Sequence, residues 1–269
     1  MTTLPATAKL ASPAIMEPTL PLDVLLHIID LLAATAVYPT TTVRSLQILS
    51  QTCKFMVPLC RKHLFSFLHL TNDSSLKRFG DLLSKNPDIA RYLRTLSYRV
   101  ENPISEHELN ILDVLKERSS LRWIVLSSPS MDWNSFPESM RSSLVSLFHL
   151  PTVTYLHIGS FKGFPATTLS SCSNLTDLGL GELDLVHPEI NQVISRSKIL
   201  TPVSLSMKIK TPGIADFLTS ASLHGGGPIV DFSRLQNAWF EVEFRGDIKQ
   251  VYKLIIAATR LEFITITSE

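Results

Sequence analysis

The stretch LRTLSY at residues 93–98 recurs in loosely altered spelling along the rest of the chain. Its copies are LRWIVL at 121–126, VTYLHI at 153–158, LTDLGL at 175–180, LTPVSL at 200–205 and LEFITI at 261–266, and a further strand-like stretch, AWFEVEF, occupies 238–244. Alternating apolar residues over such short stretches predict strands with one apolar face. We therefore expect a series of similar strands.

The spacing of these stretches predicts a repeat. The residues taken as central positions are Leu96, Ile124, Leu156, Leu178, Val203, Ala238 and Ile264, at intervals of 28, 32, 22, 25, 35 and 26 residues. The intervals bracket the leucine-rich repeat, whose units of about 20 to 29 residues hold a strand and a helix each. A lone strand and helix cannot cover their apolar sides, so neighbouring units stack into one core. The alternative is an ordinary α/β domain with a parallel sheet.

Helical patterns alternate with the expected strands. Leu76, Phe79, Leu82 and Leu83 share one helix face, which Asn86-Pro87 closes because the residue before proline avoids helical angles. Ser105, followed three residues later by Glu108, is typical of a capping box that opens the next helix. The fold class expected for residues 71–269 is α/β, an irregular leucine-rich-repeat-like domain.

The N-terminal part has a different pattern. Residues 1–19 lack periodicity and predict a disordered leader. Residues 22–32 predict a helix that is apolar nearly all round, since its only polar residues, Asp23, His27 and Asp30, form one narrow stripe. Such a helix needs covering on two sides, which favours a partner protein. We expect a loop at 33–45, then a helix through Leu46 and a last one from Pro58.

These residues resemble a known family. LPLDVLLHIIDLL at 20–32, followed by LQILSQTCKFMVPLCRKHLF at 46–65, resembles the F-box, and is most similar to the F-box-like families expanded in mushroom-forming fungi. The resemblance covers residues 20–70 and implies an N-terminal three-helix F-box cluster packed on the repeat solenoid. It implies that these helices bind a Skp-type adaptor, which links to cullin and RING subunits of a ubiquitin ligase. Downstream repeats would choose the client protein.

Two sets of site residues follow. The resemblance places an adaptor interface at Leu20, Pro21, Val24, Leu25, Ile28, Ile29, Leu32, Leu46, Leu49 and Cys53. Outward strand positions of a solenoid would bind the client, and the candidates are Arg99, Trp123, Tyr155, His157, Trp239 and Glu241. Exposed aromatic residues beside an arginine are typical of interaction hot spots, so one hypothesis is that Trp123, Tyr155 and Trp239 anchor the client. The alternative is that these three residues cap the edge of the core.

Composition excludes several classes of function. Lys and Arg total 25 against 24 Asp and Glu, so we expect no nucleic-acid partner and no attraction to an anionic membrane. The most apolar window, 24–43, holds Asp30 near its start, which speaks against a membrane span. Three scattered cysteines favour a reducing compartment, and we expect a cytoplasmic or nuclear protein.

Catalytic signatures are not recognisable. Cys53, Cys60 and His63 are too few for a structural zinc site, so the thiols are expected to be buried, with no metal. The glycines at 225–227 lack a phosphate-loop context, and no cofactor is expected. The dispersed His107, His149, His157 and His187 show no nucleophile at a recognisable spacing. Two alternatives to the adaptor remain: a binding scaffold capped by F-box-like helices, and an α/β enzyme with a polar pocket at the strand ends.

Overall fold

The computed structural model describes residues 20–34, 39–100, 106–172, 174–186, 199–209, 214, 218, 228–243 and 247–268. The chain divides into two compact units, Met1–His63 and Leu64–Glu269. Each is described by itself.

Three helices make up the first unit: α1 (Leu22–Ala34), α2 (Pro39–Thr52) and α3 (Met56–Leu64). The expected loop at 33–45 is wrong from residue 39 onward, because α2 begins at Pro39. Proline suits a first helical position, where its missing N–H is not needed. The three threonines that follow have low helix propensity, which is why the pattern favoured a loop.

Asp30 joins α1 to α3. Its Oδ1 lies 2.7 Å from Nζ of Lys62 and 2.8 Å from Nε2 of His63. Hydrogen bonds from Lys62 and then His63 lower the pKa of the Asp30 carboxyl below its ordinary value. The interior of this unit is small and contains Ile29, Leu46, Met56 and Cys60.

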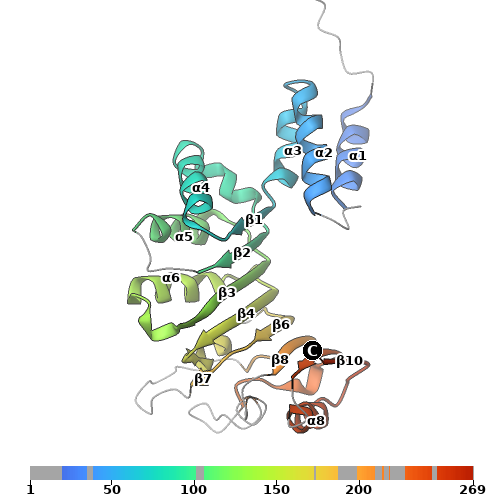
Figure 1. The fold of residues 1–269 in the computed structure, drawn as a ribbon. Helices are drawn as coiled ribbons and strands as arrows, with labels where there is room; N and C mark the ends of the chain where they lie inside the picture. The colour runs from blue at the N-terminus through green and yellow to red at the C-terminus, as the bar shows by residue number, and fades with distance from the viewer. Residues whose placement is uncertain are drawn as a thin grey trace, which may run out of the picture. The chain divides into compact units, whose positions relative to one another are not determined.

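The second unit is built on an eight-stranded sheet (Figure 1), and it is α/β. Its strands are β1 (Phe67–Leu70), β2 (Thr95–Arg99), β3 (Trp123–Asp132), β4 (Tyr155–Lys162), β6 (Asp177–Gly181), β8 (Ser204–Ile209), β9 (Asn237–Val242) and β10 (Phe263–Ser268). They lie in chain order, and every ladder between them is parallel. Two short strands, β5 (Phe164–Pro165) and β7 (Leu185–Val186), pair separately.

The register confirms most of the predicted central positions. One continuous row runs across the sheet through Leu68, Leu96, Ile124, Leu156, Leu178, Leu205, Ala238 and Ile264. Val203 was the wrong choice, because it precedes β8 and Leu205 takes the place in the row. The row also includes Leu68 of β1, a strand within the range 20–70 that the sequence assigned to the helical domain.

A second row lies two residues further along each strand, on the same face. It consists of Leu70, Tyr98, Leu126, Ile158, Leu180, Met207, Phe240 and Ile266. All of these except Ile266 are buried. Side chains two residues apart point to the same face of a strand, so the two rows together form the side of the core that the sheet contributes.

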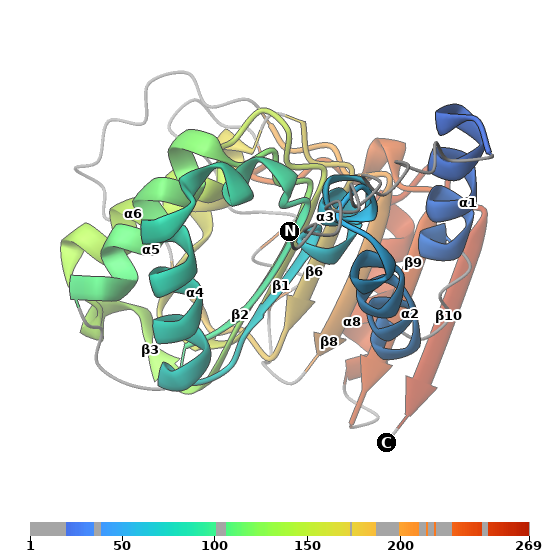
Figure 2. The same ribbon diagram turned by 90° about the horizontal axis from the view of Figure 1, so that it is seen from above.

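Helices cover this face. They are α4 (Asp73–Lys85), α5 (Glu106–Arg118), α6 (Glu138–Phe148) and α8 (Asp247–Ala257), with the shorter turns η1 (Pro87–Tyr92), η2 (Trp133–Ser135), η3 (Ala166–Ser171) and η4 (Phe232–Arg234). Figure 2 shows α4, α5 and α6 side by side along the sheet. Their buried residues, such as Phe79, Leu112, Leu144 and Leu254, join both rows in one cluster.

Local contacts set individual helices. Asn72 caps α4, accepting a 2.9 Å hydrogen bond from the backbone N–H of Ser75, whose hydroxyl oxygen in turn accepts from the backbone of Asn72. The helix face expected at 76–83 is confirmed, since Leu76, Phe79 and Leu83 are buried. The capping box expected at Ser105 lies outside the described residues.

A buried hydrogen bond ties β2 to α5. The Tyr98 hydroxyl donates to Oε1 of Glu108 over 2.8 Å. Burial, together with the negative charge of Glu108, raises the pKa of the Tyr98 phenol far above its ordinary value. Tyr98 therefore remains a neutral donor, which suits its place in the second row of the core.

The sheet ends in an exposed strand. Every residue of β10 is exposed, including Ile264 at 43% and Ile266 at 49%. On α8, Ile248, Tyr252 and Ile256 are also exposed.

One row supplies a matched test of the core. We expect Leu156→Ala to destabilise the second unit by about 2 to 5 kcal/mol, because it opens a cavity at a fully buried position. Ile264→Ala, in the same row but 43% exposed, should cost less than about 1 kcal/mol. Urea unfolding followed by tryptophan fluorescence measures both, and equal costs would contradict the assignment of the core face.

Candidate functional site

The sheet has a second face, which we call the open face. It is formed by the strand residues that alternate with the two core rows, including Ser97 of β2, Trp123 of β3, Tyr155 of β4 and Trp239 of β9. Trp123 is 51% exposed and Trp239 is 37% exposed. Large aromatic side chains that are exposed to this extent on one face are typical of binding surfaces.

Trp123 and Tyr155 form one aromatic block on the open face. They are register partners on β3 and β4, and their rings stack with centroids 4.6 Å apart and planes inclined by 14°. Burial, and secondarily the nearby charge of Asp177, raises the pKa of the Tyr155 phenol. The stack gives the open face a rigid apolar element, since each ring limits the rotation of the other.

His157 lies beside this block, over a patch of glycines. A Cβ placed on Gly179 would come within 2.2 Å of Nδ1 of His157, so the imidazole occupies the space that a side chain would need. Gly159 and Gly181 border the same ring at ordinary contact distances. Burial lowers the pKa of His157, and the ring is neutral at pH 7.

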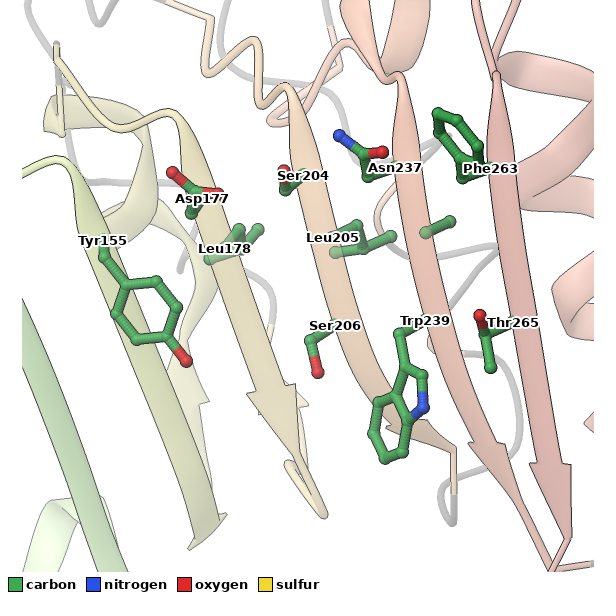
Figure 3. A pocket seen from close by; sticks show the side chains of 11 residues that line it. Tyr155, Asp177, Leu178, Ser204, Leu205, Ser206, Asn237, Trp239, Phe263 and Thr265 are labelled. Atoms are coloured by element: carbon green, nitrogen blue, oxygen red, sulfur yellow. The ribbon is translucent and has the colours of Figure 1, made fainter. Parts of the chain in front are cut away.

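A groove of about 330 Å³, which we call the trough, opens between β4 and β10 (Figure 3). Tyr155 stands at one side, and Trp239 with Phe263 at the other. The strands between them carry small outward residues, Ser204 and Ser206 on β8 and Gly179 on β6. Asp177, at the start of β6, is the only acidic residue in the lining.

A charged cluster lies further along the strands. Nζ of Lys208 on β8 contacts the carboxylate of Glu241 on β9, and lies 3.5 Å from Oε1 of Glu182. Glu241, predicted to bind a client, is therefore already held by a lysine. Arg99, another predicted client residue, is exposed on β2.

Most of the predicted adaptor residues lie on the surface. Exposed residues are Leu20, Pro21, Val24, Ile28, Leu32 and Cys53, and half-buried ones are Leu25 and Leu49. Ile29 and Leu46 are buried, with 0% and 1% exposure, so in this structure they have no surface to offer a partner. Leu31, which was not among the predicted adaptor residues, is 50% exposed. Its helical spacing from Val24 and Ile28 could have identified it.

We call Val24, Ile28, Leu31 and Leu32 the α1 stripe. They follow one another at intervals of four, three and one residues, which places them on one side of α1. Their exposed fractions run from 39% to 50%. Ile29, facing the other way, packs into the interior. The helix therefore has an inner and an outer apolar side, and the polar residues Asp23, His27 and Asp30 border the outer one.

The predicted cysteines and histidines are not gathered into a site. Cys60 and Cys172 are buried, whereas Cys53 is exposed, contrary to expectation. His107 packs on Gly80, and Nε2 of His149 lies 3.0 Å from the carbonyl oxygen of Thr168. His187 and the glycines at 225–227 lie outside the described residues. The described part of the chain holds no group of three or more His, Cys, Asp or Glu suited to a metal ion.

Among the residues that the structure describes, none of the helices combines the length and apolarity needed to cross a bilayer.

The glycine patch under His157 allows a matched substitution. Gly179→Ala should push the imidazole into solvent, because the new Cβ would overlap its Nδ1 and Cγ at 2.2 and 2.8 Å. We expect a loss of roughly 1 kcal/mol and a pKa of His157 that returns toward its ordinary value. Gly159→Ala, with its nearest atom at 3.4 Å, should change neither. NMR titration measures the pKa of His157 in both variants. An unchanged pKa in the Gly179→Ala variant would contradict the packing of the imidazole on Gly179.

The low pKa of His157 also predicts a pH dependence. Below the ordinary pKa of 6.5, the unfolded chain takes up a proton at His157 before the folded chain does. Stability of the second unit should therefore fall as pH drops through this value and continue falling until the folded pKa is passed. His157→Asn should remove that component. Thermal melts from pH 7.5 to 5 measure it, and identical slopes for both proteins would refute the assignment.

No protein-family model matches the chain, and no curated protein matches it. The chain's own surfaces provide two candidate sites: the α1 stripe in the first unit, and the open face with its trough in the second.

Proposed function

We propose that this protein is an F-box substrate adaptor of a Skp-cullin-F-box ubiquitin ligase. The first unit would bind a Skp-type adaptor, which connects to the cullin and RING subunits. The second unit would hold a client protein. In this proposal the chain performs no catalysis itself; it brings two other proteins together.

The observation that carries the proposal is the α1 stripe. Four large aliphatic side chains on one side of one helix are left in solvent, although the unit has an interior that takes Ile29 from the same helix. Taking such a side chain from full exposure to full burial is worth about 1.5 to 3 kcal/mol, and each of these four still has 39% to 50% of its surface in water. A helix with this much exposed apolar surface favours a partner, and the F-box resemblance of residues 20–70 supports a Skp-type adaptor as that partner.

The sheet supports the client-binding half. Parallel strands in chain order, with the described helices and short turns packed on one face, are the arrangement that stacked strand-and-helix repeats produce. We therefore interpret the second unit as an irregular leucine-rich-repeat-like solenoid. Such a unit leaves one sheet face for binding, and here that face carries Trp123, Tyr155 and Trp239.

A scaffold without a ligase role is the second candidate. In that case the F-box-like helices would act as a cap, and their apolar residues should be covered. The F-box resemblance of residues 20–70 favours the adaptor over the cap. An α/β enzyme would need several titratable groups that converge in one pocket. The trough is lined by two ionisable residues, Asp177 and Tyr155.

Co-purification with a fungal Skp-type adaptor tests the proposal. The double variant Val24→Asp, Ile28→Asp places two charges in the α1 stripe and should weaken adaptor binding roughly 100-fold or more. Ile29 is unsuitable for this purpose, because an aspartate at a fully buried position would unfold the unit.

Ile256→Asp is the matched control. It makes the same change at a residue of α8 that is 64% exposed in the second unit, and binding should stay as in the native chain. Circular dichroism establishes that all three proteins are folded. If the native chain does not bind the adaptor, or the stripe variant binds as well as the control, the adaptor role is wrong and the scaffold takes its place.

A further inference from the structure

The lining of the trough indicates a class of ligand more clearly than the rest of the open face does. Its side walls are aromatic: Tyr155 on β4, and Trp239 and Phe263 on β9 and β10. Between Tyr155 and Trp239 lie two strands, so their backbones are three strand spacings apart, or about 14 Å at roughly 4.8 Å each. The small residues Ser204 and Ser206 leave this width open above the sheet.

The charged group in the lining of the trough is negative. Asp177 is its only acidic residue, and no lysine, arginine or histidine lines it. The Asp177 carboxylate accepts a 2.6 Å hydrogen bond from the Thr176 hydroxyl, and within the described residues it forms no ion pair. Asp177 is the register partner of Tyr155 on the neighbouring strand, so the negative charge lies beside the aromatic wall. A phosphate or an acidic side chain would be repelled here.

Aromatic walls and a carboxylate together favour one class of ligand. The faces of Tyr, Trp and Phe rings are negative, so they attract a cation, and Asp177 adds a full negative charge. A purely apolar side chain would fit the rings but leave the carboxylate without a counter-charge. Arginine and lysine combine an apolar stem with a cationic head, which matches both parts of the lining.

Arginine fits better than lysine. Its planar guanidinium stacks on aromatic faces and can donate two parallel hydrogen bonds to one carboxylate. It is also more weakly hydrated than an ammonium group, so entering the trough costs less. The trough is open to solvent and is not an enclosed cavity, which allows the arginine to arrive on a polypeptide and not only as a free small molecule.

We propose that the trough binds an arginine side chain on an extended segment of the client protein, between Tyr155 and Trp239 and against the carboxylate of Asp177. This deepens the client-binding half of the proposed function and rests on that half, while it is independent of the adaptor.

Peptide pools test this directly. The probes are fluorescein-labelled nine-residue pools with degenerate flanks and a fixed central Arg, Lys, Leu or Glu, and binding to the full chain is measured by fluorescence anisotropy. We expect the Arg pool to bind at least about tenfold more tightly than the Leu and Glu pools, with the Lys pool between them. Asp177→Asn, which keeps the shape and removes the charge, should reduce Arg-pool binding roughly tenfold.

Asp184→Asn is the matched control, since it makes the same change at an exposed acid outside the trough and should leave binding unchanged. Trp239→Ala should weaken the Arg pool as well. Thermal melts confirm that each variant is folded. A Leu pool that binds as tightly as the Arg pool, insensitivity to Asp177→Asn, or no binding of the Arg pool up to millimolar concentration would each overturn the inference.

The two proposals fail separately. Asp177→Asn should co-purify with the Skp-type adaptor as the native chain does. If adaptor binding holds but the Arg pool is not preferred, the arginine inference is wrong and the adaptor role stands. If the Arg pool binds through Asp177 while no adaptor is retained, the trough is a client site on a scaffold without a ligase role.

Discussion

The second unit depends on one constraint: on each strand of the parallel sheet, the residues at the two equivalent positions that form the core rows must face the helices. Leu126 and Ile158 can meet in one row only if Ile124 and Leu156 meet in the other, because side chains alternate along a strand. A shift of one residue in any strand would expose its apolar pair and bury its polar neighbours. The second row runs unbroken from β1 to β9 within the core cluster and the first from β2 to β9, with Leu68 of β1 packed against it; this continuity holds the helices on one face.

The same alternation creates the binding surface. Once Ile124 and Leu156 are turned inward, Trp123 and Tyr155 must be turned outward, and the register then places their rings against each other. The open face is free of the packing demands of the core. It can therefore carry residues that a core would exclude, including the serines of β8 and a carboxylate at Asp177. The trough is a consequence of register, since its walls come from strands far apart in the chain.

In the first unit a single helix serves two purposes. α1 presents Ile29 to the interior and the α1 stripe to solvent, with Asp30 anchoring it to α3 through Lys62 and His63. That anchor is exposed, so it orients the helix more than it stabilises it. The proposed adaptor interface would use this arrangement, in which the helix is held from one side and left apolar on the other.

The sequence by itself determined seven of the eight strands of the sheet, their apolar alternation and six of the seven predicted members of the central row, because period-two patterns are local; it missed β1. It also indicated that the first helix has more apolar surface than one side can bury. Only the tertiary structure decided that Ile29 lies inside while Leu31 lies outside, that Leu205 and not Val203 continues the row, and that α2 begins at Pro39. It alone brought Tyr155, Asp177 and Trp239 to one trough. The reason is physical: a pattern along the chain records which faces are apolar, whereas the partner of each face depends on contacts between residues distant in sequence.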